Sequence, residues 1–412
     1  MDRNEFWDLY HDWQHGRITR RHFMQVTGLG VAAAVVAACA PSVGGSPSAA
    51  RTAGQTAEPS AAAPSASSAT VDVNADWTPP EGVDFGDTLV VTTWPNYHDQ
   101  KTLDRFKELT GVTTQLNIKG SNEEMLAELL IGNTGWDVLV PTNYTFETYG
   151  SKGILEPLDL TKIPRFDAAR YDTRLLSPAF YPAGSTTQYG FNKDWGTTGF
   201  TVNTKNVATP PTTWKEFFQR IQEDVTGKAM IHDYQLTSIG SALVALGYSF
   251  NSVAEAELAE AEKLLTAVKP HLLAITSDYQ PNMRSGDAWM TMTWTNDGVQ
   301  LHRDIPEIEY VIAKDGGEIW SDFFGVVADA PHREAAYAFL DFMATPMVAA
   351  EDALFHGAPL IDEAAIALLP PAATGNKISY PDAASLTKLE FGTAELLTSQ
   401  ARADLWARVK SS

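Results

Sequence analysis

The sequence contains a single cysteine, Cys39, among its 412 residues. One thiol cannot form an intramolecular disulfide, so the chain is not a disulfide framework. A lone cysteine also cannot build a cysteine-rich zinc site. Six histidines follow it, and none has the spacing of an H-E-x-x-H metal pair. We therefore expect no metal site and no cofactor.

Basic residues are also scarce, because 30 Lys and Arg face 51 Asp and Glu, for a formal net charge of −21. This charge argues against a nucleic acid partner, whose phosphates would be repelled, and suits a cationic or neutral ligand. The length is sufficient for two hydrophobic cores. The 44% of hydrophobic residues is typical of a globular protein.

The apolar run at residues 26–38 is too short to span a bilayer, which takes about 20 residues. It follows Arg20 and Arg21 and ends in "VVAAC". This pattern resembles a twin-arginine lipoprotein signal, residues 1–38, which implies cleavage before Cys39 and attachment of lipid to that residue. The alternative is a buried membrane-proximal helix with an incidental cysteine.

Residues 39–78 are rich in Ala, Ser and Pro and poor in large apolar residues. Such a segment cannot bury enough surface to offset its chain entropy, so we expect a disordered tether. It would hold a folded body away from a membrane through Cys39. The expected location is extracytoplasmic, in the periplasm or at the outer face of the cytoplasmic membrane.

Strands and helices alternate from Asp87 onward. The patterns predict a strand at 87–94, a helix at 98–111, a strand at 112–118, a helix at 121–130 and a strand at 136–141. This alternation predicts a parallel, doubly wound sheet with a ligand site at the carboxyl ends of its strands. Those ends carry "TWPNY" and "PTNY".

A second α/β unit begins near Phe200. Its predicted elements are a strand at 199–203, a helix at 212–221 capped by Thr212 or Thr213, a strand at 227–233, helices at 238–249 and 253–268, and a strand at 288–297. A further helix is predicted at 332–343. Two α/β lobes separated by a cleft is the simplest architecture for this order.

Enzyme signatures are missing from the predicted body. It has no G-x-S-x-G motif, no P-loop and no dinucleotide fingerprint. Asp297 and Asp322 could form the acid and base of an extracytoplasmic hydrolase. We expect instead that the protein is not an enzyme.

Aromatic residues stand beside carboxylates or at strand ends in "TWPNY", "DWGTTG", "MTWTND" and "EIWSDFFGV". Indole and phenol faces suit an alkyl chain that carries ammonium charge, and carboxylates accept hydrogen bonds from ammonium groups. The alternative is that these rings are core residues, as we expect for Trp136, Trp214 and Trp289.

These stretches, with "LTGVTTQLNIKGSNEEMLAEL", "WDVLVPTNY", "PTTWKEFF" and "YPDA", resemble the polyamine-binding proteins of spermidine/putrescine ABC transporters from Leu89 to Ser411. The resemblance implies an α/β, two-lobed periplasmic binding protein fold, each lobe a doubly wound sheet, hinged around a central cleft. Lobe 1 would be 87–196 with about 322–358, and lobe 2 would be 200–320 with about 365–412. The chain would cross between them near residues 197 and 320.

The resemblance also implies a ligand site and partners. Trp94, Tyr97 and Tyr144 would line one wall, and Trp294 and Trp320 the others. Asp322 falls where the family binds a terminal ammonium, and Asp297 where putrescine-preferring members carry a second acid. The implied partners are a small cationic ligand and the ABC permease and ATPase subunits. A monomer is the expected state.

Other positions depart from the family pattern. Spermidine-preferring members carry an Asp and a Glu where this sequence has Tyr234 and Thr237, although Asp233 is adjacent. A family Tyr is replaced by His356 and a Gln by Gly392. The loss of acids at one end favours a putrescine-type diamine, or a ligand with one positive charge, over spermidine.

Other ligands stay open at this point, namely an amino-phosphonate, a thiamine-like cation or a ferric ion. Ferric binding would require clustered Tyr and His ligands, and no tyrosine pair is evident in the sequence. An anionic ligand would require basic side chains, and the site stretches offer little besides Lys193 and Arg284.

Overall fold

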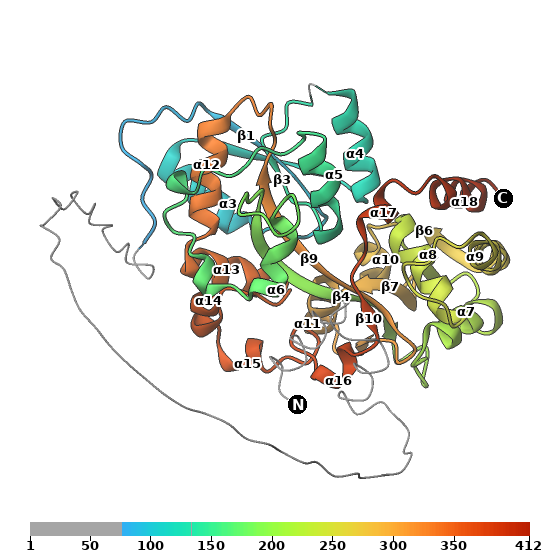
Figure 1. Cartoon of the computed structure of the whole chain (residues 1–412). Coiled ribbons are helices and arrows are strands. Elements are labelled where there is room, and N and C mark those ends of the chain that lie inside the picture. Colours follow the sequence, from blue (N-terminus) through green and yellow to red (C-terminus); the bar gives the residue numbers. More distant parts are fainter. Residues whose placement is uncertain (1–75, 133) are drawn as a thin grey trace, which may run out of the picture. The chain divides into compact units, whose positions relative to one another are not determined.

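The computed structural model describes residues 76–132 and 134–412 (Figure 1). The predicted export signal with Arg20 and Arg21, the predicted lipidation site Cys39 and nearly all of the predicted tether lie outside the described residues.

The end of the predicted tether is wrong at Trp77. Its side chain is only 1% exposed and packs against Phe106 and Phe342. The indole Nε1 donates a hydrogen bond to Asp341 at 2.8 Å. A large ring with a satisfied polar atom is a core residue, so the folded body begins by Trp77 rather than at Asp87.

The strands are β1 (Thr88–Thr93), β2 (Thr113–Ile118), β3 (Val138–Leu139), β4 (Phe191–Asn203), β5 (Ala229–Ile231), β6 (Leu272–Ile275), β7 (Met290–Trp294), β8 (Ile308–Val311), β9 (Gly317–Val326) and β10 (Leu389–Glu390). They form one curled sheet in the order β2-β1-β3-β9-β4-β7-β5-β6. Strand β8 pairs with β4, and β10 pairs with β9.

Two long strands, β4 and β9, join two parallel groups within this sheet. Strands β1, β2 and β3 pair in parallel, as the first unit of the sequence predicts, and so do β5, β6 and β7. Strands β4 and β9 run antiparallel to each other and to the group on either side. The predicted crossings near residues 197 and 320 fall inside these two strands.

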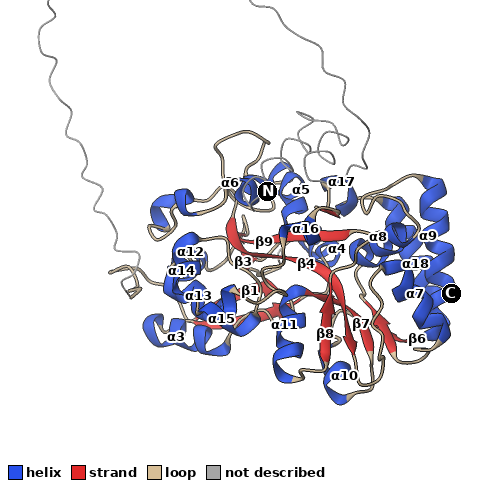
Figure 2. Cartoon of the chain, turned by 90° about the horizontal axis from the view of Figure 1, so that it is seen from below, coloured by secondary structure: helices blue, strands red, loops and turns tan. Residues whose placement is uncertain are grey.

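The helices are α3 (Gln100–Thr110), α4 (Asn122–Ile131), α5 (Phe146–Ser151), α6 (Thr173–Leu176), α7 (Trp214–Glu223), α8 (Gln235–Ala245), α9 (Glu255–Val268), α10 (Gln280–Ser285), α11 (Thr295–Asp304), α12 (Arg333–Met343), α13 (Pro346–His356), α14 (Glu363–Leu368), α15 (Pro371–Thr374), α16 (Ala383–Leu386), α17 (Ala394–Leu397) and α18 (Gln400–Ser411). Figure 2 shows the strands passing from α3, α12 and α13 at one end of the sheet to α7, α8 and α9 at the other.

The C-terminal helices divide between the two ends of the sheet. Helix α14 packs on α13 through Ala353, Leu360 and Ala365, whereas α18 packs against α8 and α9. Helix α17 lies against α5. The predicted return to lobe 2 at residue 365 is therefore placed too early, because the apolar face of α14 is covered by α13.

Side-chain caps explain several helix starts. Ser121 accepts a hydrogen bond from the backbone N–H of Glu124, and Thr213 does the same for Glu216. Of the tryptophans assigned to the core, Trp136 and Trp214 are buried. Trp289 is only half-buried, with the ammonium of Lys228 5.7 Å from its ring centre. No helix in the described part of the chain is both long and apolar enough to span a membrane.

Candidate ligand-binding site

A pocket lies where loops after several strands meet β9. Its lining comprises Trp94, Tyr97, Thr142, Tyr234, Trp294, Asn296, Glu318, Trp320 and Asp322. Trp94 follows β1, Thr142 follows β3 and Trp294 ends β7. The carboxyl ends of strands therefore form the site, as the α/β pattern predicts.

Aromatic faces form much of the cavity wall. Trp94 lies edge-on to Trp294, with ring centres 5.9 Å apart, and its Nε1 donates to the carbonyl of Val140. Trp320 sits over Gly196 of the neighbouring strand β4. A Cβ at Gly196 would lie 2.5 Å from this indole, so the glycine makes room for the ring.

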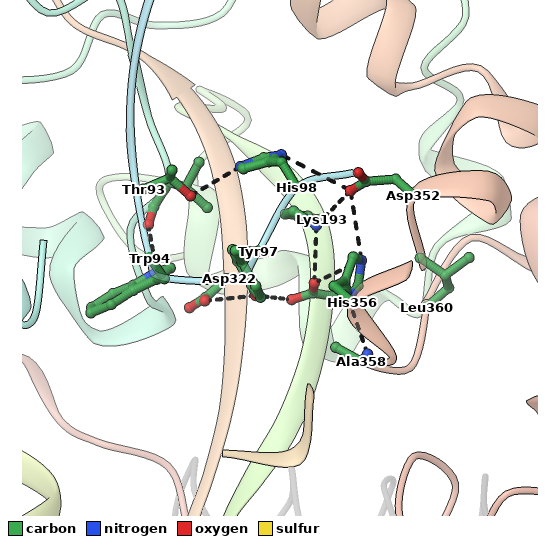
Figure 3. Close-up of polar contacts among 12 residues, drawn as sticks. Thr93, Trp94, Tyr97, His98, Lys193, Asp322, Asp352, His356, Ala358 and Leu360 are labelled. Carbon is green, nitrogen blue, oxygen red and sulfur yellow. Dashed lines mark hydrogen bonds and ion pairs between the residues drawn. The ribbon is translucent and has the colours of Figure 1, made fainter. Parts of the chain in front are cut away.

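Asp322 is buried at 5% exposure, and Tyr97 connects it to Asp194. The Tyr97 hydroxyl lies 2.9 Å from Asp322 Oδ2 and contacts Asp194 Oδ1 (Figure 3). One hydroxyl proton can serve only one of these two contacts, so the second requires a proton on a carboxyl group. Asp322 Oδ1 has no hydrogen-bond partner in the described part of the chain. The site therefore offers an acceptor to a cation.

The electrostatics of this carboxylate pair agree with a shared proton. Burial raises the pKa of Asp322, and the negative charge of Asp194 raises it further. Burial also raises the pKa of Asp194, although Lys193 opposes that shift. Two carboxylates that share a site cannot both ionise without a compensating cation.

A buried ionic cluster lies behind Tyr97, and we name it the Lys193 cluster: Lys193, Asp194, Asp352, His98 and His356. The ammonium of Lys193 is 2.9 Å from Asp352, 3.4 Å from Asp194 and 4.3 Å from the centre of the Tyr97 ring (Figure 3). Burial alone would raise the pKa of Asp352, but Lys193 lowers it to about 2. His356 Nδ1 accepts from the backbone N–H of Ala358, so Nε2 is the protonated nitrogen that faces the two carboxylates.

Glu318 is a second carboxylate in the cavity lining, and the sequence reading missed it. It precedes Trp320 by two residues and Asp322 by four on β9. Alternate residues of a strand share a face, so the period of two was the signal that could have identified it.

Asp297 does not line the cavity. It lies in the first turn of α11 rather than in a strand, and its carboxylate accepts hydrogen bonds from Tyr279 at 2.5 Å and from Gln280. The side chain of Asn96 is 3.5 Å away. Donors from the protein already surround this acid, which leaves Asp322 without the partner that the hydrolase hypothesis requires.

Three other predicted residues also lie outside the lining. Asp233 is turned toward α18, where it pairs with Lys410 at 3.0 Å. The hydroxyl of Thr237 is buried against His232 and the carbonyl of Tyr234. Tyr144 lies behind Tyr234 and contacts its hydroxyl. The side chains of Asp233, Thr237 and Tyr144 therefore contact other parts of the fold instead of the cavity.

A tyrosine pair does exist, contrary to the sequence reading. The hydroxyls of Tyr144 and Tyr234 are 2.5 Å apart, and Asn122 donates to Tyr234. The two oxygens hydrogen-bond to each other instead of converging on an ion. Within residues 76–132 and 134–412, no three His, Cys, Asp or Glu side chains group as metal ligands.

The cavity lining thus combines two carboxylates with three indole rings and contains no Lys or Arg. Arg284, flagged in the sequence, pairs with Asp304. Lys193 lies behind Tyr97, paired with its own acids. Such a lining attracts a cation with an apolar body and repels an anion.

Comparisons with known proteins identify relatives of this chain. The chain is 28% identical over 307 residues to the spermidine/putrescine-binding periplasmic protein of Salmonella typhimurium, which covers 74% of this chain and 86% of that protein. It is 26% identical to the putrescine/cadaverine-binding protein of Pseudomonas aeruginosa, covering 78% and 93% of the two chains.

A solved structure shares the fold. The spermidine/putrescine ABC transporter substrate-binding protein PotD of Streptococcus pneumoniae superposes with a TM-score of 0.62 at 26% identity, over 79% of this chain and 99% of that chain. The α/β fold is therefore of the two-lobed periplasmic binding protein type. The profile of the bacterial extracellular solute-binding proteins matches residues 101–364, and the chain belongs to that family.

Proposed function

We propose that this protein is the substrate-binding component of an ABC importer and captures a small polyamine in the cavity between its lobes. The observation that carries the proposal is Asp322, a buried carboxylate with an unpartnered oxygen in a wall of indole rings. An ammonium group placed at Asp322 Oδ1 would donate a charge-assisted hydrogen bond to that oxygen. The relatives named for spermidine, putrescine and cadaverine support the same ligand class.

A putrescine-type diamine is the ligand we favour over spermidine. The positions where spermidine-preferring members carry two acids hold Tyr234 and Thr237 here, and Thr237 faces away from the cavity. Rings at Trp94, Trp294 and Trp320 can cover methylene groups and attract the charged ends. An amino-phosphonate fits poorly, because its phosphonate would meet carboxylates and no base.

The remaining assignments follow from the sequence pattern. Closure of two hinged lobes would present the loaded protein, as a monomer, to the permease and ATPase subunits. Lipid on Cys39 would anchor it outside the cytoplasm.

In fractionated cells, Cys39→Ala is expected to move the protein from the membrane to the soluble extracytoplasmic fraction. Retention of that variant on the membrane would contradict the anchor.

Isothermal titration of the full chain tests the ligand class. We expect one-to-one binding of putrescine or cadaverine, weaker binding of spermidine and no heat with γ-aminobutyrate, whose carboxylate would meet the acids of the cavity. Absence of heat with every polyamine would refute the amine function and leave the fold untouched. A tighter complex with spermidine than with either diamine would refute only the preference.

Amine affinity is expected to rise with pH by up to tenfold per unit and to level off at about pH 8, near the raised pKa of Asp322. Burial and Asp194 raise the pKa of Asp322, so the ligand-free site holds a proton that ammonium must displace. Thr142, Tyr97 and Lys193 are the other groups near this carboxylate, and each opposes the rise in its pKa. Titration in two buffers of different ionisation enthalpy would measure the released proton. An affinity independent of pH would contradict the shared proton.

A further inference from the structure

The second carboxylate of the cavity, Glu318, belongs to no pairing in the fold. It is 2% exposed, and its Oε2 accepts a hydrogen bond from Thr198 at 2.5 Å. It forms no ion pair with any Lys or Arg of the described residues. Arg402 is the cation whose charge reaches it, but the Arg402 guanidinium donates to the carbonyls of Phe250 and Ser252.

A buried carboxylate without a cation is costly to keep ionised. Burial raises the pKa of Glu318 to about 7, and the nearby Glu123 adds to this shift. An apolar residue at this position would avoid the free-energy cost of a buried charge. The presence of an acid therefore indicates a cationic partner that comes from outside the fold. The cavity beside it is the open side from which such a partner can come.

The position of Glu318 relative to Asp322 is fixed by β9. The two residues and Trp320 lie opposite Thr198, Asp194 and Gly196 on β4, so all three side chains share one face of the sheet. Four residues of extended strand separate the Cα atoms of the two acids by about 13 Å. The indole of Trp320 stands between them.

This spacing suits a diamine lying along the strand. Side chains on one face of a strand project roughly parallel to one another, so the two carboxylates are about as far apart as their Cα atoms. With an ammonium–carboxylate contact of about 2.8 Å at each end, about 7 Å is left between the two nitrogens. An extended chain advances by about 1.2 Å per bond, so about six bonds, or about five methylenes, bridge that gap. The Trp320 ring would cover the methylenes.

We propose that Glu318 is the second ammonium-binding residue of the site, which sets the ligand's length by its distance from Asp322 across Trp320. The assignment rests on the proposed amine function and adds the residue that replaces the missing acids at Tyr234 and Thr237. The negative charge at that end of the cavity comes from the crossing strand β9 instead of from the start of α8.

A comparison of matched ligands on the full chain tests the assignment. Affinities for cadaverine and for pentylamine, which lacks the second ammonium, are measured by isothermal titration on the wild type, Glu318→Gln and Glu309→Gln. Glu309 lies on β8 with an exposed side chain and serves as the control. Glu318→Gln keeps the size of the side chain and an acceptor for Thr198, and thermal unfolding checks its fold.

Glu318→Gln is expected to weaken cadaverine binding by about 10- to 100-fold and to leave pentylamine affinity within about threefold. Equal losses for both ligands, or no loss for cadaverine, would overturn the assignment, because a structural role does not distinguish the two amines. Wild-type protein that binds neither ligand would instead refute the amine function itself and the assignment with it.

A shortened acid provides the second readout. Glu318→Asp draws the carboxylate back toward β9 by about one methylene, about 1.2 Å, and out of contact with the second ammonium group. Cadaverine affinity should therefore fall by a factor similar to that of Glu318→Gln, while pentylamine affinity stays within about threefold. An unchanged cadaverine affinity, or an equal loss for pentylamine, would overturn the proposal.

Discussion

Asp322→Asn is expected to weaken diamine binding by about 100-fold or more. The substitution preserves the shape of the side chain and its contact with Tyr97. It removes the charge that an ammonium group would meet at Oδ1, the carboxylate oxygen without a partner. A buried ammonium without a compensating negative charge is costly to desolvate, so the loss exceeds that of a surface ion pair.

The same variant should unfold at a higher temperature without ligand at about pH 8. A folded-state pKa above the unfolded value means that the protonated carboxyl stabilises the fold, and that this stability is lost as pH rises through the folded pKa. The amide introduced by Asp322→Asn stays neutral at every pH. Near pH 4 to 5 the wild type is protonated as well, and the two melting temperatures should converge.

Asp329→Asn is the matched control, since Asp329 is exposed shortly after the end of β9. Titration and thermal unfolding of both variants separate the two effects. Unchanged diamine affinity in Asp322→Asn would contradict the ligand site. Lost affinity together with a lowered melting temperature at pH 8 would contradict the electrostatic account, because packing damage would then explain the result.

Much of the fold could be predicted because its signals are local. The strand ending at Thr93, the helix ending before Gly111 and the capped start at Ser121 depend on neighbours a few residues away. Strand β4 was expected only from residue 199, although it begins at Phe191. Its first half carries Lys193 and Asp194. Charged residues in a sequence predict an exposed segment, and the distant partners that bury these two cannot be recognised locally.

The site was harder to predict, because many of its contacts join residues that are far apart in the sequence. Trp94, Trp320 and Asp322 carry a recognisable pattern of rings and acids at strand ends. Lys193 and Asp352 are 159 positions apart, and no local motif predicts that they form an ion pair. The hydrogen bonds that surround Asp297 come from another helix, so a carboxylate that looked free in the sequence proved to be occupied.

Lys193→Met should lower the free energy of unfolding by about 3–5 kcal/mol. Lys193 is the cation of the Lys193 cluster, and Met would leave Asp194 and Asp352 buried without one. The two carboxylates would also repel each other and Asp322 beyond Tyr97. Chemical denaturation measures the loss, and it should shrink as pH falls, because protonation of the acids removes the repulsion.

Lys205→Met is the control, because Lys205 pairs with Glu307 at 2.6 Å with its side chain 68% exposed. That loss should stay within about 1 kcal/mol. Lys193→Met combined with Asp352→Asn should recover part of the stability, since one uncompensated charge is removed with the cation. A single variant that loses less than about 1 kcal/mol, or a double variant that loses more than the single one, would contradict the role of Lys193. If both expectations hold, Lys193 stabilises the two carboxylates behind Tyr97, and the Lys193 cluster supports the cavity wall with a cation and an acid, Asp352, that do not line the cavity.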